Sequence, residues 1–333
     1  MDRADHDRIP EIALDWIAAG KKAALATVVQ AWGSAPRPQG SQLVISGDAE
    51  IQGSVSGGCV ESAVVAEALD ALENGESRVL EYGVSDDDAF AVGLACGGTI
   101  RVMVEPIGVG NGPPEDMIKA LVTARAARRP MIYAVNPDTW DRRFVEHGDA
   151  LFSAADAARI SDKSGFEGDW FLGVHNPPLR MIVVGAVHIA QPLLIMAREA
   201  GYDPYLIDPR EAFGAAHRFP GETISNEWPD EAIKAHGIDA RTALVTLSHD
   251  PKIDDPALQV GLKSDAFYIG ALGSKRTHAK RVTRLEDSGL TMAEIGKIHS
   301  PIGADIGSKS PAEIAVSIMA EITERLRRPE TRR

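Results

Sequence analysis

The apolar pattern of the first half of the chain predicts alternating strands and helices. Short apolar runs are separated by loops rich in glycine and proline, as in strands bounded by turns. Residues 11–20 and about 115–128 show helical spacing, and so does the stretch that follows Cys59 and ends at Asn74-Gly75. Four runs are predicted as strands: 21–32, 41–46, 77–84 and 99–107.

The pattern changes near residue 176. Pro177-Pro178 cannot continue a helix or a central strand, and the run RMIVVG after it is continuously apolar, as in a parallel sheet. A helix over 187–200 and the strand YLID complete a βαβ unit, and the runs ALVTL and FYIGAL extend the sheet. We therefore predict an α/β protein, with an N-terminal α+β domain followed by a Rossmann-like domain with a mostly parallel sheet. The predicted boundaries are 1–176 and 177–327 for the two domains and 328–333 for a basic, disordered tail.

Composition narrows the class of protein. A net charge of −13 over 333 residues argues against a nucleic-acid partner, because no basic field recruits phosphate backbones. Two cysteines are too few for a disulfide framework, which favours a reducing compartment. The N-terminus has no apolar core of signal-peptide length, and no apolar run approaches the ~18 residues of a membrane span. We expect a cytoplasmic protein with no membrane partner.

The turn of the βαβ unit resembles a dinucleotide fingerprint only in part. Gly185 occupies the first glycine position of G-x-G-x-x-G/A and Ala190 the last, but Val187 stands where backbone approaches a pyrophosphate. Asp208 follows Gly185 by 23 residues, where an acid that binds a ribose is expected. His188 lies near the helix start, where it would either contact an anion or serve packing and capping. The turn favours the Rossmann fold more strongly than it favours a bound dinucleotide.

A second glycine-bent turn, IGALGSKRTHAKR, follows a predicted strand and opens a helix. Cations at a helix start oppose the helix dipole unless an anion is present, so we predict an anion site here. The alternative is a solvated basic first turn. The loop SPIGADIGSKSP ends another strand and lines the same crevice in this interpretation. The candidate residues of the crevice are Gly270, Gly273, Ser274, Lys275, Arg276 and Gly303.

The loop TLSHDPKIDD places a histidine and three aspartates after a strand. One histidine with acids on a loop is typical of polar surface rather than of a metal site. We therefore predict no protein-bound metal from these residues, which are His249, Asp250, Asp254 and Asp255.

Both cysteines adjoin glycine pairs. Cys59 follows Gly57-Gly58 and precedes a helix, whose start stabilises a thiolate and leaves N–H groups for an anion. Cys96 precedes a similar pair, and glycine lets a flat ligand approach closely. Arg37 adds a cation on a rigid loop. These residues predict an anion site lined by thiols, with inert core cysteines as the alternative.

Six motifs in this order resemble the xanthine dehydrogenase accessory factor family, also called XdhC/CoxI. They run from about residue 22 to 325: GSAPRPQGSQLVI, SGGCVE, LACGGTIRVMVEP, VVGAVHIAQPL, IGALGSKRTHAKR and SPIGADIGSKSPAEIAVSIMAEI. Members of that family commonly have glycine where Val187 stands, so this chain departs from the family at one position. From the motifs we take as candidate cofactor-binding residues Ser34, Arg37, Gly57, Gly58, Cys59, Glu61, Cys96, Gly97, Gly98, Gly185, His188 and Asp208, with those of the second crevice.

The resemblance implies a role in cofactor maturation. Such proteins bind the molybdenum cofactor (molybdopterin), protect it during sulfuration and help insert it into enzymes of the xanthine dehydrogenase or carbon monoxide dehydrogenase type. The implied partners are an apo-molybdenum hydroxylase, a cysteine desulfurase and a second copy of the chain. The implied metal is the molybdenum of the cofactor, held near Cys59.

Two alternative functions remain open at this point. The βαβ unit and Asp208 would suit an NAD(P)-dependent oxidoreductase, although the missing second glycine argues against it. Cys59 would suit a sulfurtransferase that carries a persulfide.

Overall fold

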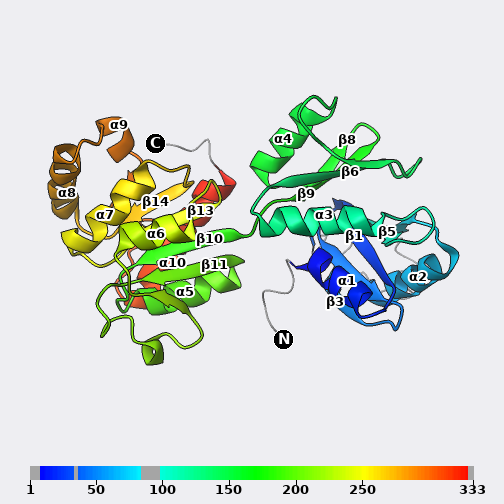
Figure 1. Cartoon of the computed structure of the whole chain (residues 1–333), viewed down its shortest axis with the longest axis horizontal. Helices are drawn as coiled ribbons and strands as arrows, with labels where there is room; N and C mark the ends of the chain where they lie inside the picture. Colours follow the sequence, from blue (N-terminus) through cyan, green and yellow to red (C-terminus); the bar gives the residue numbers. More distant parts are fainter. Residues whose placement is uncertain (1–7, 34–36, 84–97, 329–333) are drawn as a thin grey trace. The chain divides into compact units, whose positions relative to one another are not determined.

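The computed structural model describes residues 8–33, 37–83 and 98–328. The chain divides into two compact units, Met1–Pro177 and Pro178–Arg333. Val102 and Val183 lie in different sheets, one in each unit. Figure 1 shows the elements of each unit.

The first unit contains a five-stranded antiparallel sheet with helices on both faces. Alternate residues of a strand face opposite sides, so Ala24 and Ala26 pack under α2 with Val64 while Ala23 and Leu25 pack on the side of α1. The sheet order is β3-β2-β1-β5-β4. The elements are α1 (Ile9–Ala18), β1 (Ala23–Trp32), β2 (Gln42–Ser46), β3 (Ile51–Gly53), α2 (Glu61–Asn74), β4 (Arg78–Tyr82) and β5 (Thr99–Pro106).

A smaller antiparallel sheet, in the order β7-β6-β9-β8, completes this unit. Tyr133 and Phe171 of this sheet pack against Val29 and Met103 of the larger sheet, and Ala155 of α4 packs within the small sheet's other apolar cluster. The elements are α3 (Glu115–Ala126), β6 (Met131–Val135), β7 (Arg142–Phe144), α4 (Phe152–Ser161), β8 (Gly165–Glu167) and β9 (Trp170–His175).

The second unit has a six-stranded sheet whose neighbouring strands are all parallel, in the order β12-β11-β10-β13-β14-β15. This confirms the predicted α/β class and the Rossmann-like domain. The strands are β10 (Leu179–Val184), β11 (Tyr202–Ile207), β12 (Thr223–Ser225), β13 (Thr242–Thr246), β14 (Tyr268–Ala271) and β15 (Ile298–His299).

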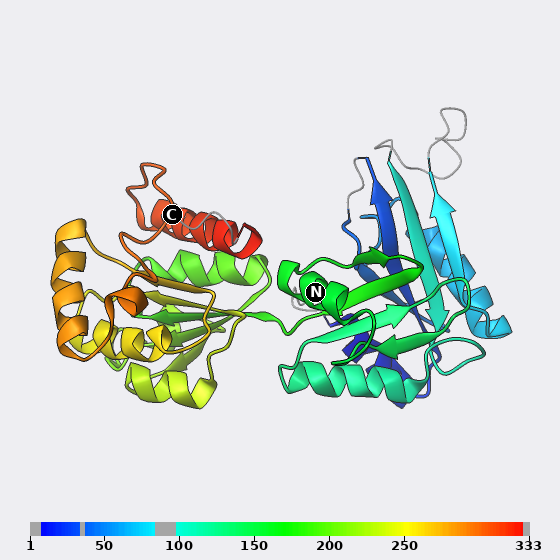
Figure 2. The same ribbon diagram turned by 90° about the horizontal axis from the view of Figure 1, so that it is seen from above.

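Helices cover both faces of the parallel sheet (Figure 2). Leu193 of α5 and Ile318 of α10 lie in one apolar core, and Ile233 of α6 and Leu258 of α7 lie in the other. α5 begins three residues later than predicted, because the N–H of Val187 bonds the carbonyl of Gly185 in a tight turn. The helices are α5 (Ala190–Glu199), η2 (Ala216–Arg218), α6 (Pro229–His236), α7 (Pro251–Leu262), α8 (Lys275–Asp287), α9 (Met292–Ile295) and α10 (Pro311–Arg327).

Candidate functional site

The loop over 54–60 carries Cys59 and lies at one end of the strands of the five-stranded sheet. β1, β3 and β4 end there and β2 and β5 begin there, because all neighbouring strands are antiparallel. The loop follows β3 directly, and Gly98 directly precedes β5. The Cys59 loop and Gly98 therefore lie at the same end of the strands. Three candidate residues, Ser34, Cys96 and Gly97, lie outside the described residues, so the proximity of the two thiols stays a prediction.

The Glu61 carboxylate holds this loop in place. It accepts hydrogen bonds from the Ser54 hydroxyl at 2.7 Å, from the Ser56 hydroxyl, and from the backbone N–H groups of Val55 at 3.2 Å, Ser56 at 2.9 Å and Gly58 at 2.9 Å. Partial burial opposes ionisation, but the bonds from Ser56 and Ser54 outweigh it and lower the pKa of Glu61 to about 2. Glu61 therefore orders the loop, and its carboxylate has little capacity left for a ligand.

Cys59 is half-buried against the core under α2, next to a part of the loop that leaves open space. Gly57 and Gly58 have φ angles of 78° and 117°, and a Cβ at Gly58 would meet nothing within 4 Å. Arg37 comes to the same loop, where its Nε donates to the Ser54 carbonyl at 3.3 Å. One loop thus carries a thiol and an unobstructed backbone position, and an arginine binds its first residue.

In the second unit, Asp208 is engaged within the protein. Its side chain is fully buried, and it accepts from the Ala186 N–H at 2.7 Å. Arg210 donates to it from the backbone and from two guanidinium nitrogens, at 2.8–3.0 Å. Although burial raises it, the hydrogen bonds of Arg210 and Ala186 lower the pKa of Asp208 overall. The carboxylate expected to bind a ribose instead fixes the turn after β10, and the exposed His188 follows that turn.

Gly185 is required by packing. Its φ is +106°, and a Cβ there would come within 2.7 Å of the Ser248 backbone nitrogen in the loop after β13. We expect Gly185→Ala to lower the free energy of unfolding by about 2–3 kcal/mol, from backbone strain and overpacking. Gly221→Ala is the matched control, because Gly221 has a φ of +78° and nothing within 4 Å of its Cβ position. Equal losses for the two variants in urea unfolding would show that Ser248 imposes no constraint.

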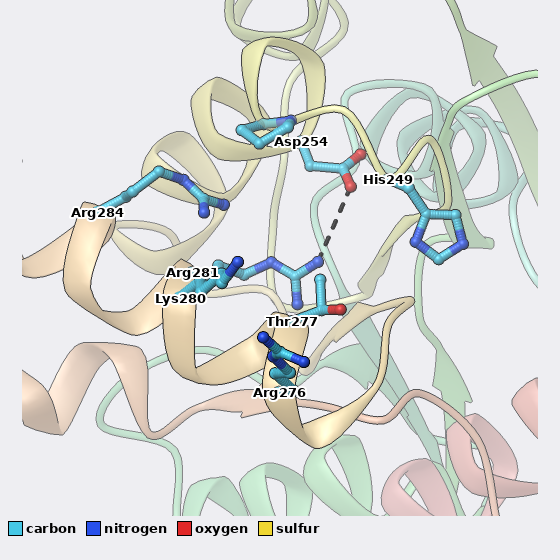
Figure 3. Close-up of a pocket in the computed structure, with 8 residues that line it drawn as sticks. His249, Asp254, Arg276, Thr277, Lys280, Arg281 and Arg284 are labelled. Atoms are coloured by element: carbon cyan, nitrogen blue, oxygen red, sulfur yellow. Dashed lines mark ion pairs between the residues drawn. The ribbon is translucent and has the colours of Figure 1, made fainter.

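A basic pocket of about 260 Å³ lies between α7 and α8 (Figure 3). We call it the α8 pocket. Arg276 is the only residue of the predicted anion site that lines it. Ser274 caps α8 by accepting from the Thr277 N–H at 3.2 Å, and Lys275 is exposed outside the lining. The lining residues are His249, Pro251, Asp254, Arg276, Thr277, Lys280, Arg281 and Arg284.

Two buried charges form the floor of the α8 pocket. Asp254 and Arg281 are each 2% exposed, and the Asp254 Oδ2 lies 3.9 Å from an Arg281 guanidinium nitrogen. Burial raises the pKa of Asp254, against the effects of Ser248 and Arg281. Burial also lowers the pKa of Arg281. Arg284, at the side, makes a bidentate pair with Asp255 at 2.6 and 3.0 Å.

The remaining glycines of the predicted crevice serve packing within the unit. A Cβ at Gly270 would collide with Ile302 and Tyr268, and one at Gly303 would overlap Ser317. Gly273, with a φ of +140°, turns the chain into α8. Sequence reasoning missed the cations that line the α8 pocket further along α8: Lys280, Arg281 and Arg284. For Lys280 and Arg284 the signal was present in KRTHAKRVTR, because they follow Arg276 at intervals of four residues.

Within the residues described by the structure, no group of three or more histidine, cysteine, aspartate or glutamate side chains could hold a metal ion. No helix of this part of the chain is long and apolar enough to cross a membrane.

Comparison with known proteins assigns the chain to a family. The XdhC Rossmann domain matches residues 181–322, and the XdhC and CoxI family matches residues 16–83. The chain belongs to the XdhC and CoxI family. This confirms the resemblance carried by the six motifs.

Relatives of this XdhC/CoxI protein span nearly its whole length. The molybdenum cofactor insertion chaperone PaoD of Escherichia coli is 29% identical over 96% of this chain and 88% of its own. A protein of Bacillus subtilis named as a probable xanthine dehydrogenase subunit is 26% identical over 92% and 94%. A crystal structure described as a xanthine dehydrogenase from Bacillus halodurans has the same fold, with a TM-score of 0.73 at 22% identity over 97% and 96%.

Proposed function

We propose that this protein binds the molybdenum cofactor and delivers it to a molybdoenzyme of the xanthine dehydrogenase class. The observation that carries the proposal is the relationship to PaoD, which extends over 96% of this chain and therefore includes both units. Molybdopterin is cargo in this function, so it binds reversibly. The proposed partner is the apo form of the client enzyme.

The residues suit a ligand of this kind. Molybdopterin combines a flat pterin, a phosphate and a metal held by sulfur. Gly58 leaves open space next to Cys59, whose thiol is of a type that binds molybdenum or sulfur, and Arg37 supplies a cation. The α8 pocket offers cations for a phosphate. These are two candidate sites, one in each unit.

The finer steps extend the same proposal. We propose that the protein shields the cofactor while its molybdenum acquires a terminal sulfur, and that a cysteine desulfurase supplies the sulfur. We also propose that the clients include enzymes of the carbon monoxide dehydrogenase type. The protein acts as a homodimer in this proposal. If Cys59 itself carries the sulfur, its thiolate attacks the desulfurase persulfide, takes the outer sulfur and releases the desulfurase thiolate.

Identification of the bound ligand tests the proposal. We expect protein purified from cells that make molybdenum cofactor to release a pterin, detected by fluorescence after oxidation. Protein from cells unable to synthesise the cofactor provides the control, and it should bind added molybdopterin. Absence of pterin in the first preparation, together with no binding of added molybdopterin, would contradict the proposal.

A nicotinamide-dependent enzyme is the second candidate function, because the strand order of the second unit is that of dinucleotide-binding folds. The engagement of Asp208 by Arg210 and Ala186 disfavours it, because a ribose hydroxyl would need that carboxylate. Titration with NAD(H) and NADP(H) distinguishes the two functions. We expect no saturable binding at micromolar concentrations.

A further inference from the structure

α8 presents a column of positive charges to α7. Arg276, Lys280 and Arg284 follow each other at intervals of four residues, so they share one face of the helix, and all three line the α8 pocket. Like charges at this spacing repel, and cations in the first turn also oppose the helix dipole. The arrangement destabilises the helix, so negative charge bound beside this face would stabilise it.

The protein supplies only part of that negative charge. Arg284 is paired with Asp255, and the buried Arg281 donates to the Leu272 carbonyl at 2.8 Å and faces Asp254. Within the described segments, Arg276 and Lys280 form no ion pair. Two exposed positive charges therefore remain unpaired at the rim, in a chain whose net charge is −13.

The floor of the pocket contains buried polar atoms without partners. Asp254 uses Oδ1 to accept from the Ser248 hydroxyl at 2.7 Å, but its buried Oδ2 has no hydrogen-bond partner. The Nε of Arg281 is also buried without one. Buried polar atoms of native proteins are nearly always satisfied, so the open Arg281 donor indicates a missing acceptor, from a ligand or a water, while the Asp254 oxygen has room for the donor of a water. Figure 3 shows both side chains meeting in the pocket.

We infer that the α8 pocket binds the phosphate group of a phosphorylated organic ligand, through Arg276 and Lys280. A dianionic phosphate matches the two unpaired cations, whereas a carboxylate would leave one of them unpaired. A cavity of about 260 Å³ exceeds what a simple monatomic anion fills. Two ligands carry such a phosphate. One is the pterin cargo, and this assignment rests on the proposed function; the other is a free nucleotide, and that assignment is independent of it.

Calorimetric titration of the full chain with inorganic pyrophosphate tests the inference. We expect saturable binding in about 50 mM NaCl that weakens in about 200 mM NaCl, because salt screens the rim charges. Arg276→Ala and Lys280→Ala should each weaken binding roughly ten- to a hundredfold. Lys297→Ala is the matched control, since it removes an exposed lysine of the same unit outside the pocket, and should leave the affinity unchanged.

Thermal unfolding shows whether the variants fold, and it gives a second measurement. Pyrophosphate should raise the Tm of the unmodified protein but not that of the Arg276→Ala/Lys280→Ala double variant. The inference is overturned if the unmodified protein does not bind pyrophosphate at low salt, or if the folded double variant binds it equally well. It is also overturned if Lys275→Ala abolishes binding and Lys280→Ala has no effect, since the anion would then lie at the helix start.

Two further arms separate the sources of phosphate. If AMP displaces pyrophosphate at a lower concentration than inorganic phosphate does, the ligand of the pocket is a nucleotide. If the double variant loses its co-purified pterin and AMP does not displace pyrophosphate, the pocket binds the phosphate of the pterin. If the double variant loses pyrophosphate binding but keeps its pterin, the pocket is confirmed as a site separate from the cargo. Failure of pyrophosphate binding with pterin retained would refute the pocket alone and leave the proposed function standing.

Discussion

Glu61→Ala is expected to open the loop that carries Cys59. Five donors of residues 54–58 lose their common acceptor, and Ser56, which is 1% exposed, would need a new partner for two of them. Hydrogen bonds to a charged acceptor are the stronger kind, so we expect the free energy of local opening to fall by about 3 kcal/mol. That corresponds to roughly a hundredfold faster reaction of Cys59 with a thiol reagent.

The labelling experiment uses a Cys96→Ser background, so that one thiol is measured. Glu61→Gln is the matched control, because it keeps the shape and one acceptor oxygen but removes the charge. Its labelling rate should lie between those of the parent and Glu61→Ala. A rate for Glu61→Ala within twofold of the parent would mean that the loop is held by other contacts.

The lowered pKa of Glu61 also predicts a pH dependence. A carboxylate whose folded-state pKa lies below its ordinary 4.5 stabilises the protein fully above that value, and the stabilisation is lost as the pH falls toward about 2. The difference in Tm between the parent and Glu61→Gln should therefore be constant above about pH 5 and shrink between about pH 4.5 and 2. A difference that persists unchanged at pH 2 would contradict the role of the charge.

The fold was largely predictable because its second unit follows local rules. The apolar run of β10, the turn at Gly185 and the helix after it are encoded within some 20 residues, and the parallel sheet follows from repeating such units. The strand order was not predictable, because it depends on contacts between segments far apart in the chain. β8 is only three residues long, so its pairing with β9 stabilises it rather than its own sequence pattern.

The sequence predicts where the candidate residues lie along the strands and helices, but it does not predict the contacts that they make. The spacing of Asp208 from Gly185 places an acid at the end of β11, but no spacing rule shows that Arg210 and the Ala186 N–H engage it. The basic spacing on α8 was visible in the sequence. That Asp254 of α7 forms the floor under it is a tertiary contact, so the α8 pocket emerges only in the structure.

Cys59→Ser is expected to abolish transfer of active cofactor to the client enzyme while leaving the fold intact. The half-buried thiol packs against the core under α2, and serine is close to it in volume, so the urea midpoint should change little. The hydroxyl lacks the affinity of a thiolate for molybdenum and cannot form a persulfide. Client activity should therefore fall to the level without accessory protein, in a reaction of purified protein, cofactor and apo-enzyme.

Cys96→Ser is the comparison variant, and we expect it to lose less activity, because Cys59 adjoins the start of α2 whereas the sequence predicts no helix start at Cys96. Mass spectrometry after incubation with a cysteine desulfurase separates two roles of Cys59. An added sulfur atom on Cys59 assigns the persulfide carrier, whereas pterin binding that is lost in Cys59→Ser without such an adduct assigns contact with the molybdenum. Full client activation by folded Cys59→Ser would refute both roles and leave the thiol as part of the apolar core under α2, against which it already packs.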